Sequence, residues 1–567
     1  IEDLNLSGIE FSESNSRYYP LGDFCSYIVG YAKSYEDQSI KKMVGEMGLE
    51  LSYDKTLKGK NGYKVYQTDA NGYALVDGTL REKDPTNGQD IYLTIDSGLQ
   101  RDLDYLMSNA YNESGAQVVT AGVMEIKTGR ILAMSTYPSF NPNERNISTF
   151  NNYFLEGTIE CGSVFKPFIY ADSIEEGKYD HNAYYNSGMY NVYYGNKLVA
   201  TIKDHNHGQG WGSITYDQGL YHSSNVAICN LLDKGYVTKE VLTEKLNDLG
   251  FFQGDTMDGL ACSSSINAYT RSSAGKLEYL TTGFGQGSTV TPYQLLKAYS
   301  VFGNGGKTVQ PHVVEKIVDP DTNKVTYQAT TQYSKQIFSE NTVKEVRDLM
   351  LGVIEDQQGT GKNYRLDNGV RMIGKTGTGQ VVENGGYSTS VYMHSFVGLA
   401  PYEDPQVVMF ITFKSGDSYA QYMPNIVKQT MTSALQVVNQ YNAPDEKTVD
   451  ESYTLDSYTN QSVNYVKSKL ESKSLNVQVI GNGGSVIEQY PLARSKVTSG
   501  DKIFIKTEGT DITLPDLTGW SKKEVQTYAS LAEIQLVIEG TSGHVTSQSI
   551  EANQVIHKGD SLWITLS

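Results

Sequence analysis

The chain has 567 residues, which is too long for a single hydrophobic core and predicts about three to four domains. Its net charge of -18 and the lack of any basic cluster in the sequence argue against nucleic acid as a partner, because phosphate binding needs concentrated positive charge. The four cysteines include no Cys-x-x-Cys pair, which excludes a typical zinc site and a dense disulfide scaffold, although one bridge stays possible. No apolar run in the sequence reaches the ~18 residues of a membrane-spanning helix.

The N-terminal part, residues 1–88, alternates short extended runs with glycine-rich turns such as Gly59-Lys60-Asn61-Gly62. Its sequence shows no catalytic cluster. We therefore expect a β-rich supporting domain, incomplete at its N-terminal side, which ends near the turn Pro85-Thr86-Asn87-Gly88-Gln89.

Residues 89–441 combine strand and helix patterns and are predicted to form one α+β domain. Asp96 or Ser97 can cap its first helix, after a strand at 91–96. Lys127-Thr128-Gly129 predicts a hairpin between strands at 117–125 and 130–136. Further helices are expected at 214–234, 237–250 and 425–439, and further strands at 308–318, 370–376, 391–400 and 405–413.

The C-terminal part is an internal repeat that follows a polar linker at 442–452. A shift of 59 residues aligns Leu455 with Leu514 and Gly481 with Gly540, and it matches ten further identical pairs without a gap. We expect two small modules, 453–508 and 509–567, each with one helix followed by a small sheet. The sequence of neither copy offers a nucleophile with a base, so both are predicted to be binding or spacer modules.

The stretch from Glu160 to Ala171 contains the first candidate catalytic pair, Ser163 and Lys166. We expect a helix that begins at Ser163, so that the two side chains lie one turn apart and can share a proton. A serine hydroxyl needs a base, and a lysine serves as one when burial lowers its pKa. The same spacing recurs at Ser39, Ser273 and Ser499, where an exposed serine and a solvated lysine are the simpler interpretation.

Two further motifs supply the rest of a possible acyl-transfer site. In Ser223-Ser224-Asn225, Ser223 could relay a proton and the Asn225 amide could hold Lys166 or a substrate carbonyl, although a helix N-cap explains the motif equally well. Along the strand Lys375 to Gln380, the side chains of Lys375, Thr376 and Thr378 could bind a substrate carboxylate, and Gly377 would give a ligand room for close approach. The backbone N–H groups of Ser163 and Thr378 could form an oxyanion hole.

The order Ser-x-x-Lys, Ser-x-Asn, Lys-Thr-Gly makes three weak motifs into one strong signal. The chain resembles a class B penicillin-binding protein of Gram-positive type, a peptidoglycan D,D-transpeptidase with two C-terminal PASTA repeats. The resemblance covers nearly the whole chain, and its further motifs are Arg17-Tyr18-Tyr19-Pro20, Ile28-Val29-Gly30, Gly48-Leu49-Glu50, Leu93-Thr94-Ile95-Asp96, Thr128-Gly129-Arg130-Ile131-Leu132-Ala133-Met134, Pro138-Ser139-Phe140-Asn141-Pro142-Asn143 and Leu514-Pro515-Asp516-Leu517-Thr518-Gly519-Trp520-Ser521.

The resemblance implies a transpeptidase domain of the serine β-lactamase type, with a central antiparallel sheet, beside a pedestal or dimerisation domain and the PASTA pair. It implies that Ser163 is acylated, that Lys166 is its base, and that Ser223 and Asn225 line the cleft. Lys375, Thr376, Gly377 and Thr378 would face the substrate, with Gln380 near bound ligand. No cofactor and no metal are implied.

The resemblance also implies stem peptides ending in D-Ala-D-Ala and β-lactam antibiotics as ligands. It implies an upstream membrane helix absent from this sequence, a catalytic part outside the cytoplasm, and a glycosyltransferase of the division machinery as partner. Two PASTA copies favour a septal role over a sporulation role. The sequence departs from the family at Cys161, where proline is common, and at Gly379, where alanine is common and glycine is expected to loosen the strand.

Two other functions stay open at this point. A β-lactamase would need a water-activating base, and the sequence has no Glu-x-x-x-Asn between Ser223 and Lys375, although an oxacillinase-like use of Lys166 needs none. A non-catalytic sensor of wall fragments or antibiotics would use the PASTA pair for binding.

Overall fold

The computed structural model describes residues 16–37, 40–71, 73–383, 385–442, 453–473, 475–497, 501–540 and 544–566. The chain divides into two compact units, 1–442 and 443–567. The predicted linker, except its first residue, lies outside the described residues. None of the helices in the described ranges is both long and apolar enough to cross a membrane.

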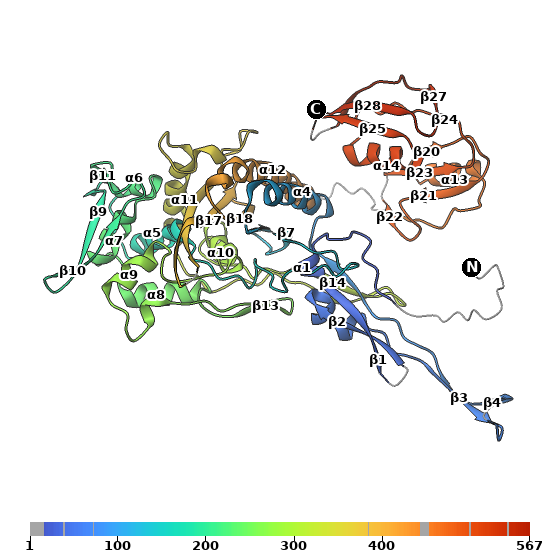
Figure 1. Ribbon diagram of the computed structural model, residues 1–567, viewed down its shortest axis with the longest axis horizontal. Helices are drawn as coiled ribbons and strands as arrows, with labels where there is room; N and C mark the ends of the chain where they lie inside the picture. Colours follow the sequence, from blue (N-terminus) through green and yellow to red (C-terminus); the bar gives the residue numbers. More distant parts are fainter. Residues whose placement is uncertain are drawn as a thin grey trace. The chain divides into compact units, whose positions relative to one another are not determined.

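The N-terminal region is β-rich, as predicted. It contains two antiparallel pairs, β1 (Tyr31–Asp37) with β2 (Ile40–Met47) and β3 (Tyr63–Thr68) with β4 (Ala74–Lys83). Three short helices accompany these strands: α1 (Ser26–Val29), α2 (Gly48–Ser52) and α3 (Asp54–Leu57). The hairpin of β3 and β4 projects away from the rest of the first unit (Figure 1).

The centre of the first unit is a five-stranded antiparallel sheet in the order β16-β17-β18-β6-β7. Its strands are β6 (Val118–Glu125), β7 (Ile131–Tyr137), β16 (Ile373–Glu383), β17 (Gly386–Ala400) and β18 (Val407–Ser415). All five correspond to predicted strands, and the hairpin of β6 and β7 is confirmed. β16 lies at the edge of the sheet, so one side of this strand is available to other parts of the unit.

Helices cover both faces of this sheet because alternate residues of each strand point to opposite faces. On one face α4 (Ser97–Ser114), whose first turn is capped by Asp96 as predicted, packs beside α12 (Met423–Asn442) (Figure 1). The other face packs against a larger helical region. The helices of that region are α5 (Lys166–Glu175), α6 (Tyr216–Tyr221), α7 (Asn225–Asp233), α8 (Lys239–Asp248), α9 (Lys276–Gly283), α10 (Pro292–Tyr299) and α11 (Glu340–Glu355).

Several details of this region differ from the sequence prediction. The single helix expected at 214–234 is two helices, because the chain leaves the helical conformation at 222–224 and Ser223 has a positive φ of 58°. Helix α11 was not predicted, although its first turn has a serine cap, Ser339. The strand expected at 308–318 is shorter, β14 (Val314–Asp319), and it pairs with β15 (Lys324–Gln328) and β5 (Asp90–Leu93).

Between α5 and α9 lie three further short strand pairs that complete the first unit. They are formed by β8 (Tyr184–Asn186) with β11 (Ser213–Thr215), β9 (Met189–Tyr194) with β10 (Lys197–Lys203), and β12 (Asp255–Met257) with β13 (Leu260–Cys262). All four cysteines are buried and free.

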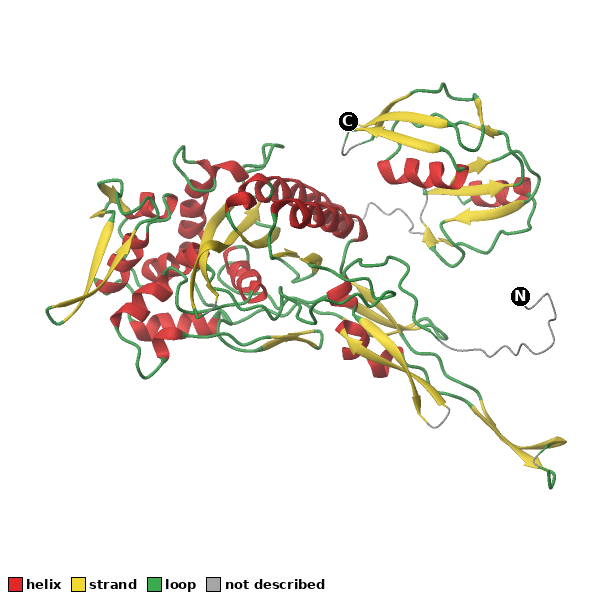
Figure 2. Ribbon diagram, in the orientation of Figure 1, coloured by secondary structure: helices red, strands yellow, loops and turns green. Residues whose placement is uncertain are grey.

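The second unit contains the two repeats, each with one helix and a three-stranded sheet, as predicted (Figure 2). The first has α13 (Val463–Glu471) with β20 (Asn476–Ile480), β21 (Val486–Tyr490) and β23 (Lys502–Thr507). The second has α14 (Lys522–Ala532) with β25 (Gln535–Glu539), β26 (Val545–Gln548) and β28 (Ser561–Leu566). Two-residue strands at β19 (Tyr453–Thr454), β22 (Lys496–Val497), β24 (Ile512–Thr513) and β27 (Val555–Ile556) complete them.

Candidate active site

Ser163 lies in a short 3-10 helix, Gly162–Phe165, and α5 begins only at Lys166. The prediction of one helix beginning at Ser163 was therefore wrong in its first turn. A 3-10 turn has three residues per turn, so it places the side chains of residues 163 and 166 one above the other. The neighbours of Ser163 in this turn are buried, whereas Ser163 itself is half-buried and lines a cavity.

Two contacts from other segments hold this turn in place. The Gly162 N–H donates to the Gly285 carbonyl at 3.0 Å, and the Tyr299 hydroxyl donates to the Val164 carbonyl. Gly162 has φ +61°, a conformation that favours glycine. The residues on either side of Ser163 thus have fixed backbone positions.

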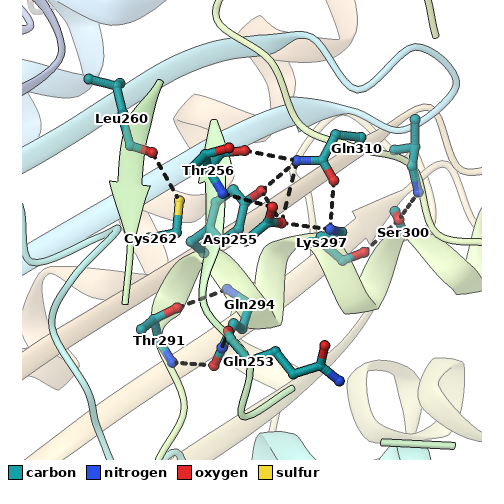
Figure 3. Close-up of polar contacts among 12 residues, drawn as sticks. Gln253, Asp255, Thr256, Leu260, Cys262, Thr291, Gln294, Lys297, Ser300 and Gln310 are labelled. Atoms are coloured by element: carbon teal, nitrogen blue, oxygen red, sulfur yellow. Dashed lines mark hydrogen bonds and ion pairs between the residues drawn. The ribbon is translucent and has the colours of Figure 1, made fainter. Parts of the chain in front are cut away.

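The helix that carries Tyr299 is itself anchored by a polar network (Figure 3). In α10 the Lys297 ammonium donates to Asp255 at 2.7 Å and to the Gln310 side chain at 2.6 Å. One turn earlier, Gln294 donates to the Gln253 carbonyl at 2.8 Å. This network ties α10 to the segments before and after it, and so fixes the helix that supports the turn of Ser163.

Strand β16 lies against the same turn at a distance that only glycines permit. A Cβ on Gly162 would lie 2.2 Å from the Thr378 carbonyl oxygen, and a Cβ on Gly379 would lie 1.6 Å from the Glu160 carbonyl oxygen. Both distances are far below van der Waals contact. Gly379 therefore allows the strand to approach the turn, which differs from the expectation that it loosens the strand.

Gly377, which was expected to give a ligand room, lines the cavity and also lies close to the turn of Ser163. A Cβ at Gly377 would lie 2.7 Å from the Cys161 carbonyl oxygen and 2.9 Å from the Val164 side chain. The missing side chain therefore makes room for the turn of Ser163. Cys161 is itself buried, and burial raises the pKa of its thiol well above the ordinary value.

Two buried lysines converge on one hydroxyl group. The Lys166 ammonium donates to the Ser223 carbonyl and lies 3.3 Å from the Ser223 Oγ. The Lys375 ammonium lies 2.8 Å from the same Oγ and 3.0 Å from the Thr376 carbonyl. The structure therefore joins the three sequence motifs through Ser223. Both lysines have exposed fractions of 0%.

Burial changes the protonation of both lysines. It lowers the pKa of Lys166 to about 7, against the opposing effect of the Asp204 carboxylate. Burial also lowers the pKa of Lys375 well below its ordinary value, and the positive charge of Lys166 contributes to that shift. Lys166 can therefore lose its proton near neutral pH, which is the condition for a lysine to act as a base.

Asp204 was missed in the sequence, where nothing near it repeats a motif spacing. One of its oxygens accepts from the Ser224 hydroxyl at 2.8 Å and from the Val226 N–H at 3.1 Å, and the other accepts from the Gly188 N–H at 2.8 Å. The carboxylate thus holds the start of α7 beside the strained backbone of Ser223.

The site opens into a cavity of about 470 Å³. The predicted residues that line it are Ser163, Ser223, Asn225, Thr376, Gly377, Thr378 and Gln380. Lys166 and Lys375 lie behind its wall and do not line it. The Asn225 amide donates to the Lys203 carbonyl at 3.0 Å, while the hydrogen bonds of Lys166 go to Ser223. Across the described part of the chain, no three His, Cys, Asp or Glu side chains are placed to hold a metal ion.

A protein-family model described as the penicillin binding protein transpeptidase domain matches residues 119–434, which is more than half of the chain. The chain belongs to the penicillin-binding protein family. Models of the penicillin-binding protein dimerisation domain and of the PASTA domain match residues 2–93 and residues 453–509 and 512–567. The resemblance inferred from the three motifs is confirmed.

The relatives of this penicillin-binding protein agree with that assignment. The chain is 31% identical to the stage V sporulation protein D of Bacillus subtilis over 89% of its own length and 77% of the relative. It is 29% identical to a probable peptidoglycan D,D-transpeptidase PenA of Neisseria meningitidis, over 74% of this chain and 68% of that protein. The crystal structure of penicillin binding protein 2X from Streptococcus thermophilus is similar, with a TM-score of 0.65 and 26% identity, over 97% of this chain and 82% of that one.

This penicillin-binding protein is a class B enzyme with a transpeptidase domain, a dimerisation domain and two PASTA repeats, in the multidomain α+β fold that was predicted. Its family binds peptidoglycan stem peptides and β-lactams. His205, Phe284 and Gln286 also line the cavity, and none of them belongs to a motif that could have been recognised in the sequence.

Proposed function

We propose that this peptidoglycan D,D-transpeptidase works through an acyl-enzyme on Ser163, with Lys166 as the base. The observation that carries this assignment is the position of Lys166, whose buried ammonium contacts Ser223 beside a cavity that Ser163 lines. A pKa of about 7 makes its neutral form available at working pH.

In the first half-reaction, Ser163 Oγ attacks the carbonyl carbon of the penultimate D-Ala while its proton passes to Lys166. The backbone N–H groups of Ser163 and Thr378 stabilise the oxyanion. The C–N bond then breaks, and the amine of the terminal D-Ala leaves with a proton relayed from Lys166 through the Ser223 hydroxyl. The 3.3 Å separation of Lys166 Nζ and Ser223 Oγ supports this relay.

In the second half-reaction, an amine of a neighbouring stem peptide attacks the ester carbonyl. The amine gives up a proton along the same path, a new amide bond forms, and the bond to Ser163 Oγ breaks as that oxygen regains a proton. Two stem peptides are then cross-linked.

The remaining predicted residues would bind the substrate. Asn225, Thr376, Thr378 and Gln380 line the cavity and can hydrogen-bond to the backbone of a stem peptide. Lys375 does not line the cavity and instead contacts Ser223, so we propose that it orients this hydroxyl.

A β-lactam would follow the same path and remain on Ser163, because its opened ring does not leave the site. Slow loss of this adduct distinguishes a transpeptidase from a β-lactamase, which would release it within milliseconds. The penicillin-binding family of the chain supports the slow outcome.

The cellular setting is also a proposal. Peptidoglycan is assembled outside the cytoplasm, so we propose that the catalytic part lies on the outer face of the cell membrane, held by a membrane helix and joined by a glycosyltransferase of the division machinery. The similarity to a sporulation protein of Bacillus subtilis supports a sporulation role as the second candidate.

The test is a cross-linking assay with a pentapeptide donor that ends in D-Ala-D-Ala and an amine acceptor. Wild type should release D-Ala and form the cross-linked product, whereas Ser163→Ala should form none. Tight binding of muropeptides without any turnover by the wild type would instead favour the sensor function.

A further inference from the structure

The two PASTA repeats stack as four alternating layers: helix α13, the first sheet, helix α14 and the second sheet. Alternate residues of β23 point to opposite faces of the first sheet. Ile503 and Ile505 pack with Val466 of α13, whereas Phe504 packs with Tyr528 of α14. One helix therefore covers each face of the first sheet.

The contact between the first sheet and α14 is centred on Phe504. Its ring lies 5.8 Å from that of Trp520 and 6.5 Å from that of Tyr528. The exposed fractions of these three side chains are 2%, 5% and 0%. In this contact the outer face of the first sheet packs against the helix of the second repeat.

Two ion pairs flank this aromatic contact. Lys502 of the first sheet pairs with Glu524 at 2.8 Å, and Lys506 pairs with Glu533 at 2.8 Å. The pairs fix the direction and the register of the helix on the sheet.

Within the second unit the stack has two outer faces, and an aromatic side chain is exposed on each. The 59-residue shift places Trp563 of the second sheet at the position of Phe504, and its exposed fraction is 58%. The same shift places Tyr465 of α13 at the position of Glu524, and its exposed fraction is also 58%. Terminal repeats normally present polar outer faces, so two exposed aromatic side chains at these positions need an explanation.

The two outer faces of the stack also lack the same ion pair. Ser561 stands where the covered sheet has Lys502, and Tyr465 stands where the covering helix has Glu524. Both halves of one ion pair are therefore absent, one from each end. A contact between these two faces would therefore leave neither a lysine nor a glutamate of that pair without its partner.

We propose that the PASTA pair binds a second copy of this chain head to tail, with α13 of one copy on the Trp563 face of the other. The contact would continue the stacking that already joins the two repeats. Trp563 would lie against Gln461 and Lys469, which occupy the positions of Trp520 and Tyr528. Such a contact uses two different surfaces, so it builds chains of molecules rather than closed pairs.

A mixing experiment with the full chain tests this proposal. Wild type should show mass that rises with concentration in sedimentation velocity. Trp563→Glu and Tyr465→Glu should each weaken this association by about 30-fold or more, because each removes a central aromatic side chain. Because each variant keeps one intact end, an equimolar mixture should form one-to-one pairs. Leu492→Glu is the matched control, because Leu492 lies on the same repeat as Tyr465 and is 67% exposed. This variant should associate as wild type does.

The opposite results would overturn the proposal. Wild type that stays monomeric at about 100 µM would contradict it. So would variants that associate as strongly as wild type, or a mixture of the two variants that shows no increase in mass over either variant alone. Any association through the N-terminal region is the same in wild type and in all variants. The test therefore compares the strength of association between wild type and each variant.

A photo-crosslinker at position 563 gives an independent readout in a mixture of isotopically light and heavy copies. It should link the light copy to the 461–469 segment of the heavy copy. Links only between two 563 positions, or only within one copy, would contradict a head-to-tail contact.

Discussion

Gly162→Ala tests whether the turn of Ser163 must lie against strand β16. Gly162 has φ +61°, and alanine in that conformation costs about 1 kcal/mol. In addition, the new Cβ would lie 2.2 Å from the Thr378 carbonyl oxygen, so the two backbones must separate by about 1 Å to reach van der Waals contact.

A displacement of about 1 Å at a catalytic group can cost ~100-fold in rate, which corresponds to about 2.7 kcal/mol. We therefore expect Gly162→Ala to reduce the second-order rate of acylation by a fluorescent penicillin about 100-fold. A folded enzyme should remain, with an intact thermal unfolding transition.

Gly177→Ala separates backbone strain from the clash. Gly177 lies just beyond the other end of α5 with φ +64°, and a Cβ there would meet nothing within 4 Å. This variant should lose about 1 kcal/mol of stability and acylate normally. Acylation of Gly162→Ala within about 3-fold of wild type would refute the reasoning.

The protonation of Lys166 and the contacts around it can each be tested by substitution or by pH. Acylation should rise with pH through about pH 7 and level off above it, because only neutral Lys166 accepts the serine proton; a rate that is flat from pH 5 to 9 in stopped-flow measurements would contradict this. Asp204→Asn should move that midpoint to lower pH, since the carboxylate raises the pKa of Lys166, and an upward shift would oppose the prediction. Tyr299→Phe should lower the free energy of unfolding by about 1 kcal/mol, because it removes the hydrogen bond to the Val164 carbonyl. Tyr528→Phe should change this free energy little, because the buried Tyr528 hydroxyl has no hydrogen-bond partner among the described residues. Denaturant titration of both variants compares the two.

The sequence predicted the parts of the site that depend on order and local chemistry. Ser163 and Lys166 are three residues apart, so any helical turn brings them together, and the strand of Lys375 is marked by its apolar and glycine pattern. The repeat was predictable because one offset relates the two copies throughout. The number of helices around Ser223 could not be predicted. The break between α6 and α7 depends on a positive φ at Ser223, which a serine rarely adopts.

What the sequence could not show is which groups approach from distant segments. Asp204 reaches the start of α7 from the end of β10, and Tyr299 reaches Val164 from α10. The same limit applies to Gly377, because a glycine indicates a close approach without identifying the segment that comes close. Lys375 was expected to face the substrate, and only the packed structure places its ammonium on the Ser223 hydroxyl.

The most direct test of the central claim is the intact mass of the enzyme after brief exposure to penicillin, followed by peptide mapping, for wild type, Ser163→Ala and Lys166→Ala. We predict one adduct on the peptide that contains Ser163 in wild type, a lifetime of hours, no adduct in Ser163→Ala and strongly slowed labelling in Lys166→Ala. An adduct of the same yield in Ser163→Ala would contradict the assignment of the nucleophile.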